Sequence, residues 1–203
     1  MQDELDILRE VGSIAAAHGS IALSEILGRR INLFLPSMDM VSLTRVPSKI
    51  NVERIGIAVI AKLLTGLKGE IIFLLDEQNA FKLIDLSYEL RDEDKKIGAL
   101  TEIGMSLIKE MGSIVIGAYV CALSMILKRI ILPPPPTLIS GTIEEILRMI
   151  FSGYQEEDYA VFIEAVFEEP KEKIKGGFYL VLTPGVASDI KETCKNMLDE
   201  LEK

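Results

Sequence analysis

The sequence predicts a mixed α/β (α+β) domain in which an α-β-β-β-α unit occurs twice, related by a pseudo-two-fold axis, with the helices packed on a shared β-sheet. Three observations lead to this fold class. The chain resembles itself, without a gap, at an offset of 100 residues. Helical and β-rich runs follow one another in a similar order in both halves. Finally, 203 residues that are 49% hydrophobic supply enough apolar surface for a well-buried core.

The repeat is clearest in two octets, DILREVGS at Asp6–Ser13 and SLIKEMGS at Ser106–Ser113. The residues that recur unchanged in the second copy are Glu10, Gly12, Ser13, Ile14, Ala22, Leu23, Ser24, Ile26, Leu27, Arg29, Ile31 and Pro36, which return as Glu110, Gly112, Ser113, Ile114, Ala122, Leu123, Ser124, Ile126, Leu127, Arg129, Ile131 and Pro136. Chance does not produce such a run. We therefore predict one domain, 1–203, made of two internal repeats, 1–99 and 100–203.

The elements of the first half follow from periodicity. A helix is expected to begin near Leu5, at the start of the first octet. The predicted strands are Met38–Val46, Ile55–Leu64 and Gly69–Leu75, and a helix at Asp76–Leu90 ends the unit.

The second half repeats this order less exactly. Its first helix is expected to begin near Met105, and β-rich runs lie at Tyr159–Phe167 and Gly177–Leu182. A helix is predicted at Thr142–Phe151, because the helix dipole favours the acids in its first turn. Pro184 and Gly185 introduce a final amphipathic helix through Leu201.

On a helix with about 100° per residue, Asp6, Glu10 and Ser13 fall in one narrow sector. Small or polar residues continue this stripe and repeat it in the second copy: Ala17, Ser20 and Ser24, then Ser106, Glu110, Ser113, Gly117 and Ser124. The opposite side is expected to face the core and holds Ile7, Leu8, Val11, Ile14, Ala15 and Ala22, with His18 packed among them. A glutamate repeated on an otherwise apolar helix is a candidate functional residue.

The charge of the chain excludes two classes of partner. A formal net charge of −9 opposes nucleic acid and anionic membranes, since both require a cationic surface. The uncharged run Met111–Leu127 falls slightly short of the ~18 to 20 residues that span a bilayer. Its counterpart carries His18, Ser20 and Glu25, so we expect both copies to be packed helices and predict no membrane insertion.

Cysteine use and the first residues predict a cytoplasmic protein. Cys121 and Cys194 stand apart, without metal-ligand spacing, and are expected to be buried thiols of a reduced protein. The stretch MQDELDILRE is acidic where an export signal is basic and then apolar. No metal or cofactor site of the protein's own is predicted.

The spacing of the two octets resembles the CheC family of chemotaxis phosphatases, which includes CheC, CheX and FliY and shares its fold with the middle domain of FliM. The family pattern is Asp or Ser, three residues, Glu, two residues, Asn, twenty-two residues and Pro. Asp6, Glu10 and Pro36 match it in the first copy, and Ser106, Glu110 and Pro136 match it in the second. The Asn is replaced by serine in both copies.

The resemblance implies hydrolysis of the aspartyl phosphate of the response regulator CheY, which resets signalling. It implies that Glu10 and Glu110 contact the regulator's active-site lysine, that Ser13 and Ser113 stand where an Asn orients the attacking water, and that Asp6 and Ser106 help bind the partner. Any Mg²⁺ is carried by CheY. Serine places its hydroxyl closer to the backbone than an amide, so the replacement predicts weak catalysis.

Two alternatives remain beside the phosphatase, which the sequence favours slightly. One is a non-catalytic binding module that docks phosphorylated CheY, the receptor deamidase CheD, or both. The resemblance places the CheD contact on the helix near Thr142–Phe151, with the candidate residues Ile143, Ile146, Leu147 and Ile150. The other is a FliM-like motor subunit without catalysis, which is disfavoured because both glutamates are retained.

Overall fold

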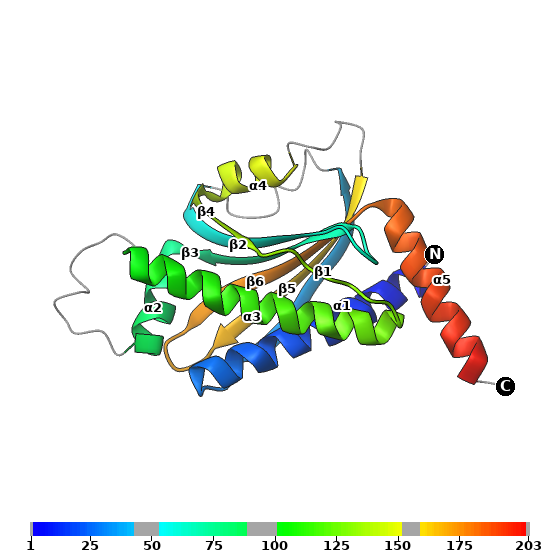
Figure 1. Ribbon diagram of the computed structural model, residues 1–203, viewed down its shortest axis with the longest axis horizontal. Helices are drawn as coiled ribbons and strands as arrows, with labels where there is room; N and C mark the ends of the chain where they lie inside the picture. Colours follow the sequence, from blue (N-terminus) through cyan, green and yellow to red (C-terminus); the bar gives the residue numbers. More distant parts are fainter. Residues whose placement is uncertain (1, 43–52, 89–100, 152–158, 202–203) are drawn as a thin grey trace.

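The computed structural model describes residues 2–42, 53–88, 101–151 and 159–201 (Figure 1). The first half contributes α1 (Gln2–Leu27), β1 (Asn32–Ser42), β2 (Ile55–Leu63), β3 (Gly69–Asp76) and α2 (Glu77–Tyr88). The second half contributes α3 (Glu102–Leu127), β4 (Thr137–Thr142), α4 (Ile143–Phe151), β5 (Tyr159–Glu169), β6 (Ile174–Leu182) and α5 (Pro184–Leu201). The predicted fold class, an α-β-β-β-α unit present twice on a shared sheet, is confirmed, and α4 is an addition to the second unit.

The sheet has six strands in the order β1-β5-β6-β3-β2-β4, and every pair of neighbours is antiparallel. The strands correspond in pairs between the two halves: β1 with β4, β2 with β5, and β3 with β6. When the members of each pair are exchanged, the order read from one edge equals the order read from the other. The central pair, β6 and β3, contains one strand from each repeat. Each repeat also places its first strand on the outer side of the other repeat's strands, β1 beside β5 and β4 beside β2. The two halves are therefore interleaved within one sheet.

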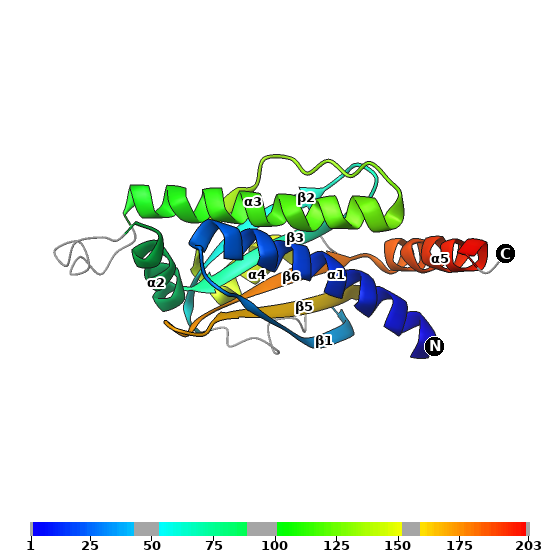
Figure 2. The same ribbon diagram turned by 90° about the horizontal axis from the view of Figure 1, so that it is seen from below.

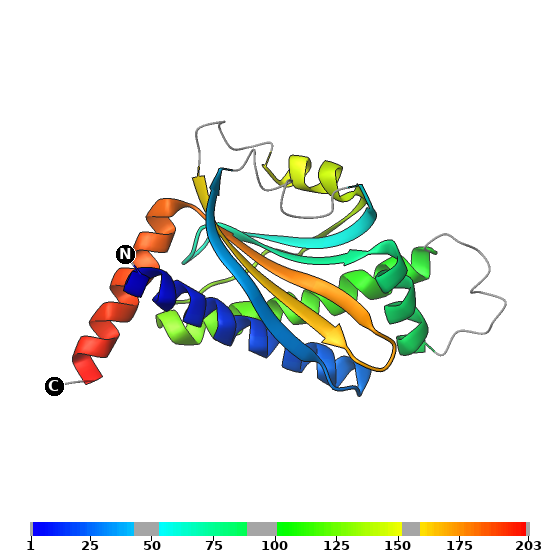
Figure 3. The ribbon, with the colours of Figure 1, turned by 180° about the vertical axis from the view of Figure 1, so that it is seen from behind.

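The two faces of the sheet are covered differently. The long helices α1 and α3 lie side by side on one face, and α4 lies on the other (Figures 1 and 3). Alternate residues of each strand divide between the two faces. On β2, for example, Val59 and Ala61 belong to the core under α1 and α3, whereas Ala58 packs with α4.

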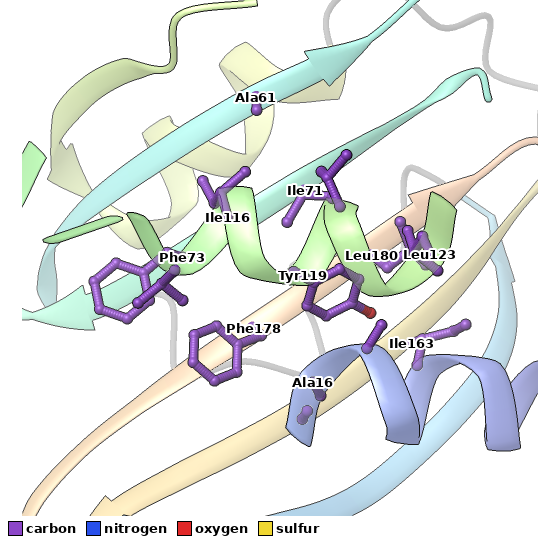
Figure 4. Close-up of a cluster of buried hydrophobic side chains, with 14 of the residues drawn as sticks. Ala16, Ala61, Ile71, Phe73, Ile116, Tyr119, Leu123, Ile163, Phe178 and Leu180 are labelled. Carbon is purple, nitrogen blue, oxygen red and sulfur yellow. The ribbon is translucent and has the colours of Figure 1, made fainter. Parts of the chain in front are cut away.

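The larger core lies between the sheet and the pair α1 and α3 (Figure 4). Three phenylalanine rings of adjacent strands, Phe73, Phe167 and Phe178, stack with centroids 5.2 to 5.6 Å apart. Tyr119 of α3 points into the same cluster and is almost completely buried. Burial raises the pKa of its phenol. Rings of this size account for much of the apolar area that the fold removes from water.

The glycine of each Gly-Ser pair sets how closely its helix approaches the sheet. A Cβ on Gly12 would lie 2.7 Å from the Ile163 side chain on β5, and one on Gly112 would lie 2.6 Å from Val59 on β2. Any larger residue would force the helix and strand apart. Each long helix thus packs at its glycine against a strand of the other repeat.

Helix α3 is long and apolar enough to cross a membrane by length and composition alone. In the structure, half of its most apolar window is buried against the rest of the chain. Its N-terminus is capped by Thr101, whose hydroxyl accepts a hydrogen bond from the Gly104 amide at 3.1 Å. It ends at Lys128, which adopts the left-handed conformation with φ 50°. These features are those of a core helix.

Several predicted boundaries and one element were wrong. The first strand begins at Asn32 rather than Met38, and the expected residues 43–46 of that strand and 89–90 of α2 lie outside the described part of the chain. Strand β4 was missed because the run Pro133–Pro136 directly precedes it and its six residues lack a clear alternation.

Two other predictions concern the cysteines and the repeat boundary. Cys121 is exposed rather than buried, while Cys194 is buried as predicted. The division into repeats at residues 99 and 100 also falls outside the described residues and stays a prediction.

The glycine contact predicts opposite effects of the same substitution at two positions of α3. Gly112→Ala should destabilise the protein by about 1–3 kcal/mol, because Val59 is stiff and the added methyl has no room. Gly117→Ala should stabilise it by up to about 1 kcal/mol, because nothing lies within 4 Å of its Cβ position and alanine favours the helix. Urea unfolding of both variants measures the difference, and equal stabilities would contradict the close contact.

Candidate functional site

The residues of the first octet lie where the helical wheel places them. Asp6 and Glu10 are exposed on the outer surface of α1, and Ser13 is half-buried beside them. Val11 and Gly12, between Glu10 and Ser13, are buried against the sheet. The close approach at the glycine turns the glutamate and the serine away from the sheet, toward solvent.

The second octet presents the same surface on α3. Ser106 and Glu110 are exposed and Ser113 is half-buried. From residues 6 and 106 to residues 27 and 127, the two helices have the same burial class at every aligned position except two, 18/118 and 27/127. The octets therefore form two candidate sites in matching environments.

The two sites lie toward opposite ends of a pair of antiparallel helices (Figure 2). Contact between Gly19 and Val115, whose Cγ1 lies 3.5 Å from the glycine's Cβ position, sets the register of α1 against α3. In this register Glu110 is level with Ser24, so the two glutamates are separated by roughly 14 residues, or about 21 Å along the helices. One surface carries both sites.

Apolar side chains occupy the surface between the two glutamates. Ile14, Ile21 and Ile114 are exposed there, together with Cys121, and Met125 is exposed just beyond the level of Glu10. Exposed apolar groups of this kind, flanked by charge, are typical of a surface that binds another protein. This was not predicted, because the wheel had assigned Ile14 to the core; its side chain is 38% exposed.

Within the described part of the chain, the fold makes no visible use of either glutamate. Among the residues that the structure describes, no hydrogen bond or ion pair involves Glu10 or Glu110, so both carboxylates are available to a partner. The serines differ from each other. The Ser113 hydroxyl donates a 2.7 Å hydrogen bond to the Lys109 carbonyl of its own helix, whereas no such bond is made by Ser13 within the described ranges.

Two residues assigned to the polar stripe have structural roles instead. The Ser24 hydroxyl donates to the Arg29 carbonyl at 2.5 Å, and the Ser124 hydroxyl accepts a hydrogen bond from the Ile131 amide at 3.3 Å. Both hold the chain as it leaves its helix. Ser20 was wrongly expected on this stripe and is buried, and His18 was wrongly expected in the core and is exposed. The wheel misplaces them because the contact between α1 and α3 covers one edge of each helix.

The apolar residues expected to bind a partner on α4 are buried. Ile143, Ile146, Leu147 and Ile150 pack on the second face of the sheet, with 8% exposure or less. The expectation of a partner surface at these four positions is therefore wrong. The reason is that this sheet face is itself apolar, including Ile72 and Val181, and α4 covers it. Among residues 143–150, the large apolar side chain that remains exposed is Met149.

The start of α4 is fixed by a capping box. The Glu145 amide donates to the Thr142 hydroxyl at 3.2 Å, and the Thr142 amide donates to the Glu145 carboxylate at 2.9 Å. These hydrogen bonds lower the pKa of Glu145.

As for metal sites, within the described ranges no three His, Cys, Asp or Glu side chains are grouped to hold an ion.

Comparison with known proteins finds a curated relative. The chain is 27% identical over 136 residues to the CheY-P phosphatase CheC of Bacillus subtilis, a match that covers 66% of this chain and 65% of that protein. No family model matches the chain. The match thus spans slightly less than two thirds of the relative.

Solved structures show the same fold over most of the chain. FliY of Thermotoga maritima has a TM-score of 0.75 at 23% identity and covers 97% of this chain, which covers 98% of it. The FliM middle domain of H. pylori has a TM-score of 0.63 at 11% identity, with coverages of 95% and 99%. A chain of the CheX-CheY-BeF3-Mg²⁺ complex of Borrelia burgdorferi has a TM-score of 0.55 at 18% identity, with coverages of 85% and 96%.

The chain is similar in sequence to CheC and has the fold of FliY, CheX and the FliM middle domain. These findings support the resemblance to the CheC family that the octets predicted from their spacing. A role in chemotaxis and the roles of the individual residues remain predictions.

Changing Glu10 and Glu110 to Ala should leave the melting temperature nearly unchanged, because exposed helical sites without partners alter stability by less than about 0.5 kcal/mol. Glu145→Ala is the matched control: it is also an exposed glutamate on a helix, but it removes a cap and should lower the melting temperature. Thermal unfolding followed by circular dichroism compares the three proteins. A large loss of stability in the double variant would show that the two glutamates serve the fold.

Proposed function

We propose that this protein dephosphorylates a CheY response regulator, using the surface of α1 and α3. The observation that carries the proposal is the presentation of Glu10 and Glu110 twice in the same setting. Each is exposed, is free of internal partners among the described residues, and has a serine three residues further along. A fold that needed these groups for stability would have paired or buried them.

The chemistry is the transfer of a phosphoryl group from an aspartate of the partner to water. Such reactions depend mainly on positioning and on stabilising charge. In this proposal each glutamate holds the regulator through its active-site lysine, and Asp6 or Ser106 adds a polar contact. Ser13 or Ser113 orients the attacking water. Mg²⁺ is supplied by the regulator, so the protein needs no metal of its own.

Two comparisons support the partner. The curated relative is named as a phosphatase of CheY-P, and the fold is shared with a chain solved in a complex of CheX with CheY, BeF3 and Mg²⁺. The exposed apolar side chains between Glu10 and Glu110 also support docking of a protein partner on this surface. A cytoplasmic location is part of the proposal, and two free thiols at Cys121 and Cys194 are consistent with it.

The serines set the expected rate. The Ser113 hydroxyl donates its hydrogen bond to the Lys109 carbonyl. In this conformation it can accept a hydrogen bond from water but cannot donate one. Ser13 makes no hydrogen bond within the described ranges, so it keeps both functions. The first site is therefore the more competent of the two, and both reach less far than an amide.

A second function, binding of the deamidase CheD, rests on the outward side of α4. Met149 is 57% exposed there, next to the charged Arg148. The four buried apolar residues of α4 would then support this surface from beneath rather than touch the partner.

A charged side chain at the exposed methionine tests CheD binding. Met149→Glu should reduce capture of the protein by immobilised CheD at least about tenfold, because it places a charge in an apolar contact. Met125→Glu, on the α1 and α3 surface, is the control and should leave capture unchanged. Equal capture of wild type and the Met149 variant would remove CheD binding from this helix.

Restoring the amide tests the phosphatase. Ser13→Asn and Ser113→Asn together should raise the rate of phosphate release from phosphorylated CheY by up to about 100-fold if water positioning is the defect. The gain should appear in turnover rather than in binding, because the water acts in the transition state. Ser113→Asn alone should give the larger share, since that site starts from an internally bonded hydroxyl.

The control for this experiment is Ala17→Asn, which places an amide one helical turn from Ser13 and should give no gain. Glu10→Ala with Glu110→Ala should weaken binding of phosphorylated CheY. Steady-state phosphate release at saturating CheY separates the outcomes. High rates in wild type that asparagine does not improve would show that serine suffices. Rates near the uncatalysed level in every variant would rule out the phosphatase and leave the binding module.

A further inference from the structure

Glu70 is an acid in an apolar environment on the second face of the sheet. It lies on β3 and is only 4% exposed, and its neighbours on the same face include Ile72 and Val181. One of its carboxylate oxygens, Oε2, is buried without any hydrogen-bond partner. The other, Oε1, lies 4.0 Å from Lys62 Nζ, beyond hydrogen-bond distance. The fold therefore buries this group without satisfying it.

Another buried acid shows how the fold satisfies a carboxylate when it needs one. Glu169 is 1% exposed, and its Oε2 accepts a 2.7 Å hydrogen bond from the Glu172 amide in the turn that follows β5. No equivalent hydrogen bond to Glu70 is made by the residues that the structure describes. Burial accordingly raises the pKa of the Glu70 carboxyl, and Lys62 offsets this in part. Leaving a buried acceptor unpaired is costly, so a residue of this kind calls for an explanation.

Glu70 is one of the residues that line a cavity of about 490 Å³. The cavity lies between β2, β3 and β4, the end of α4 and the proline run that precedes β4. Its walls are mainly apolar, with Ile60, Ile139 and Ile150 from three elements and Pro134 and Pro135 from the proline run. A volume within the usual range of ligand sites, with mainly apolar walls and three polar lining residues, Lys62, Glu70 and Thr137, is the pattern of a small-molecule pocket.

The chemistry of the cavity selects a cation. Oε2 is enclosed by the fold, so the acceptor open to a ligand is Oε1, which lies 4.0 Å from Lys62 Nζ, beyond hydrogen-bond distance, and still favours a positive group. The net charge of −9 attracts cations to the whole molecule and disfavours anions. The isoleucines and prolines require an aliphatic body behind the charged group. Lys62, with a side chain that is 63% exposed, stands at the rim and competes for the same carboxylate.

We propose that this cavity binds an organic cation, an ammonium or guanidinium group carried on an aliphatic chain, with Glu70 as the residue that receives the charge. The group comes either from a free small amine or from a basic side chain of a bound protein. The cavity lies on the opposite face of the sheet from Glu10 and Glu110. The inference therefore does not depend on the proposed phosphatase function.

Calorimetric titration of the full chain with n-hexylammonium tests the site, because that probe combines a charged head with an aliphatic body. We expect saturable binding to wild type and no binding of n-hexanol, which has the same chain without the charge. Glu70→Gln should weaken hexylammonium binding at least about tenfold, as expected for a lost charge-assisted hydrogen bond. Glu192→Gln is the matched control, since it removes one negative charge from exposed α5, and it should bind as wild type does.

Lys62→Met provides an independent test that leaves Glu70 intact. Removing the competing cation should strengthen hexylammonium binding severalfold. Titration with N-acetyl-lysine methylamide identifies the source: tighter binding than hexylammonium indicates a basic side chain of a protein, and weaker binding indicates a free amine. Absence of saturable binding of both probes, or equal binding to wild type, Glu70→Gln and Lys62→Met, would overturn the proposal.

Discussion

At Gly12 and Gly112 the two long helices lie so close to the sheet that a methyl group would meet Ile163 or Val59 at 2.7 Å or less. This contact is the constraint on which the rest of the structure depends. It joins each helix to a strand of the other repeat, so neither half has a core of its own. It also decides which way the neighbouring residues point, because the helix face at the glycine is fixed against the sheet. The exposure of Glu10 and Glu110 follows from the packing at Gly12 and Gly112.

The acids of the chain show how the surroundings of a carboxylate separate structural from functional roles. Glu145 closes a capping box and Glu169 accepts an amide in a turn, so the fold uses both. Glu10 and Glu110 are exposed to solvent. There a carboxylate without a protein partner does not lower the stability of the fold and is accessible to a binding partner. Glu70 is buried without a donor, where it is costly. A residue that lowers stability without serving the fold is more easily explained by a ligand than by packing.

The duplication is kept on one face of the sheet and lost on the other. Under α1 and α3 the burial of the two helices matches almost residue for residue, because both must fit the same interleaved sheet. The opposite face carries α4, which has no counterpart among the described residues of the first half. The cavity at Glu70 lies on that second face, at the end of α4. New chemistry is more readily accommodated there, since a change on this face does not have to be made twice.

The sequence by itself determined the repeat, the fold class and the positions of both octets, because a 100-residue offset and a helical period can be measured without knowing any contact. It placed Glu10, Glu110, Ser13 and Ser113 on the outer side of their helices correctly. Only the tertiary structure decided that α4 turns its apolar residues inward, that Ile14 and Cys121 lie on the surface, and that β4 completes the sheet. Those features depend on which surface covers which, and a periodic pattern shows that a face is apolar without showing what lies against it.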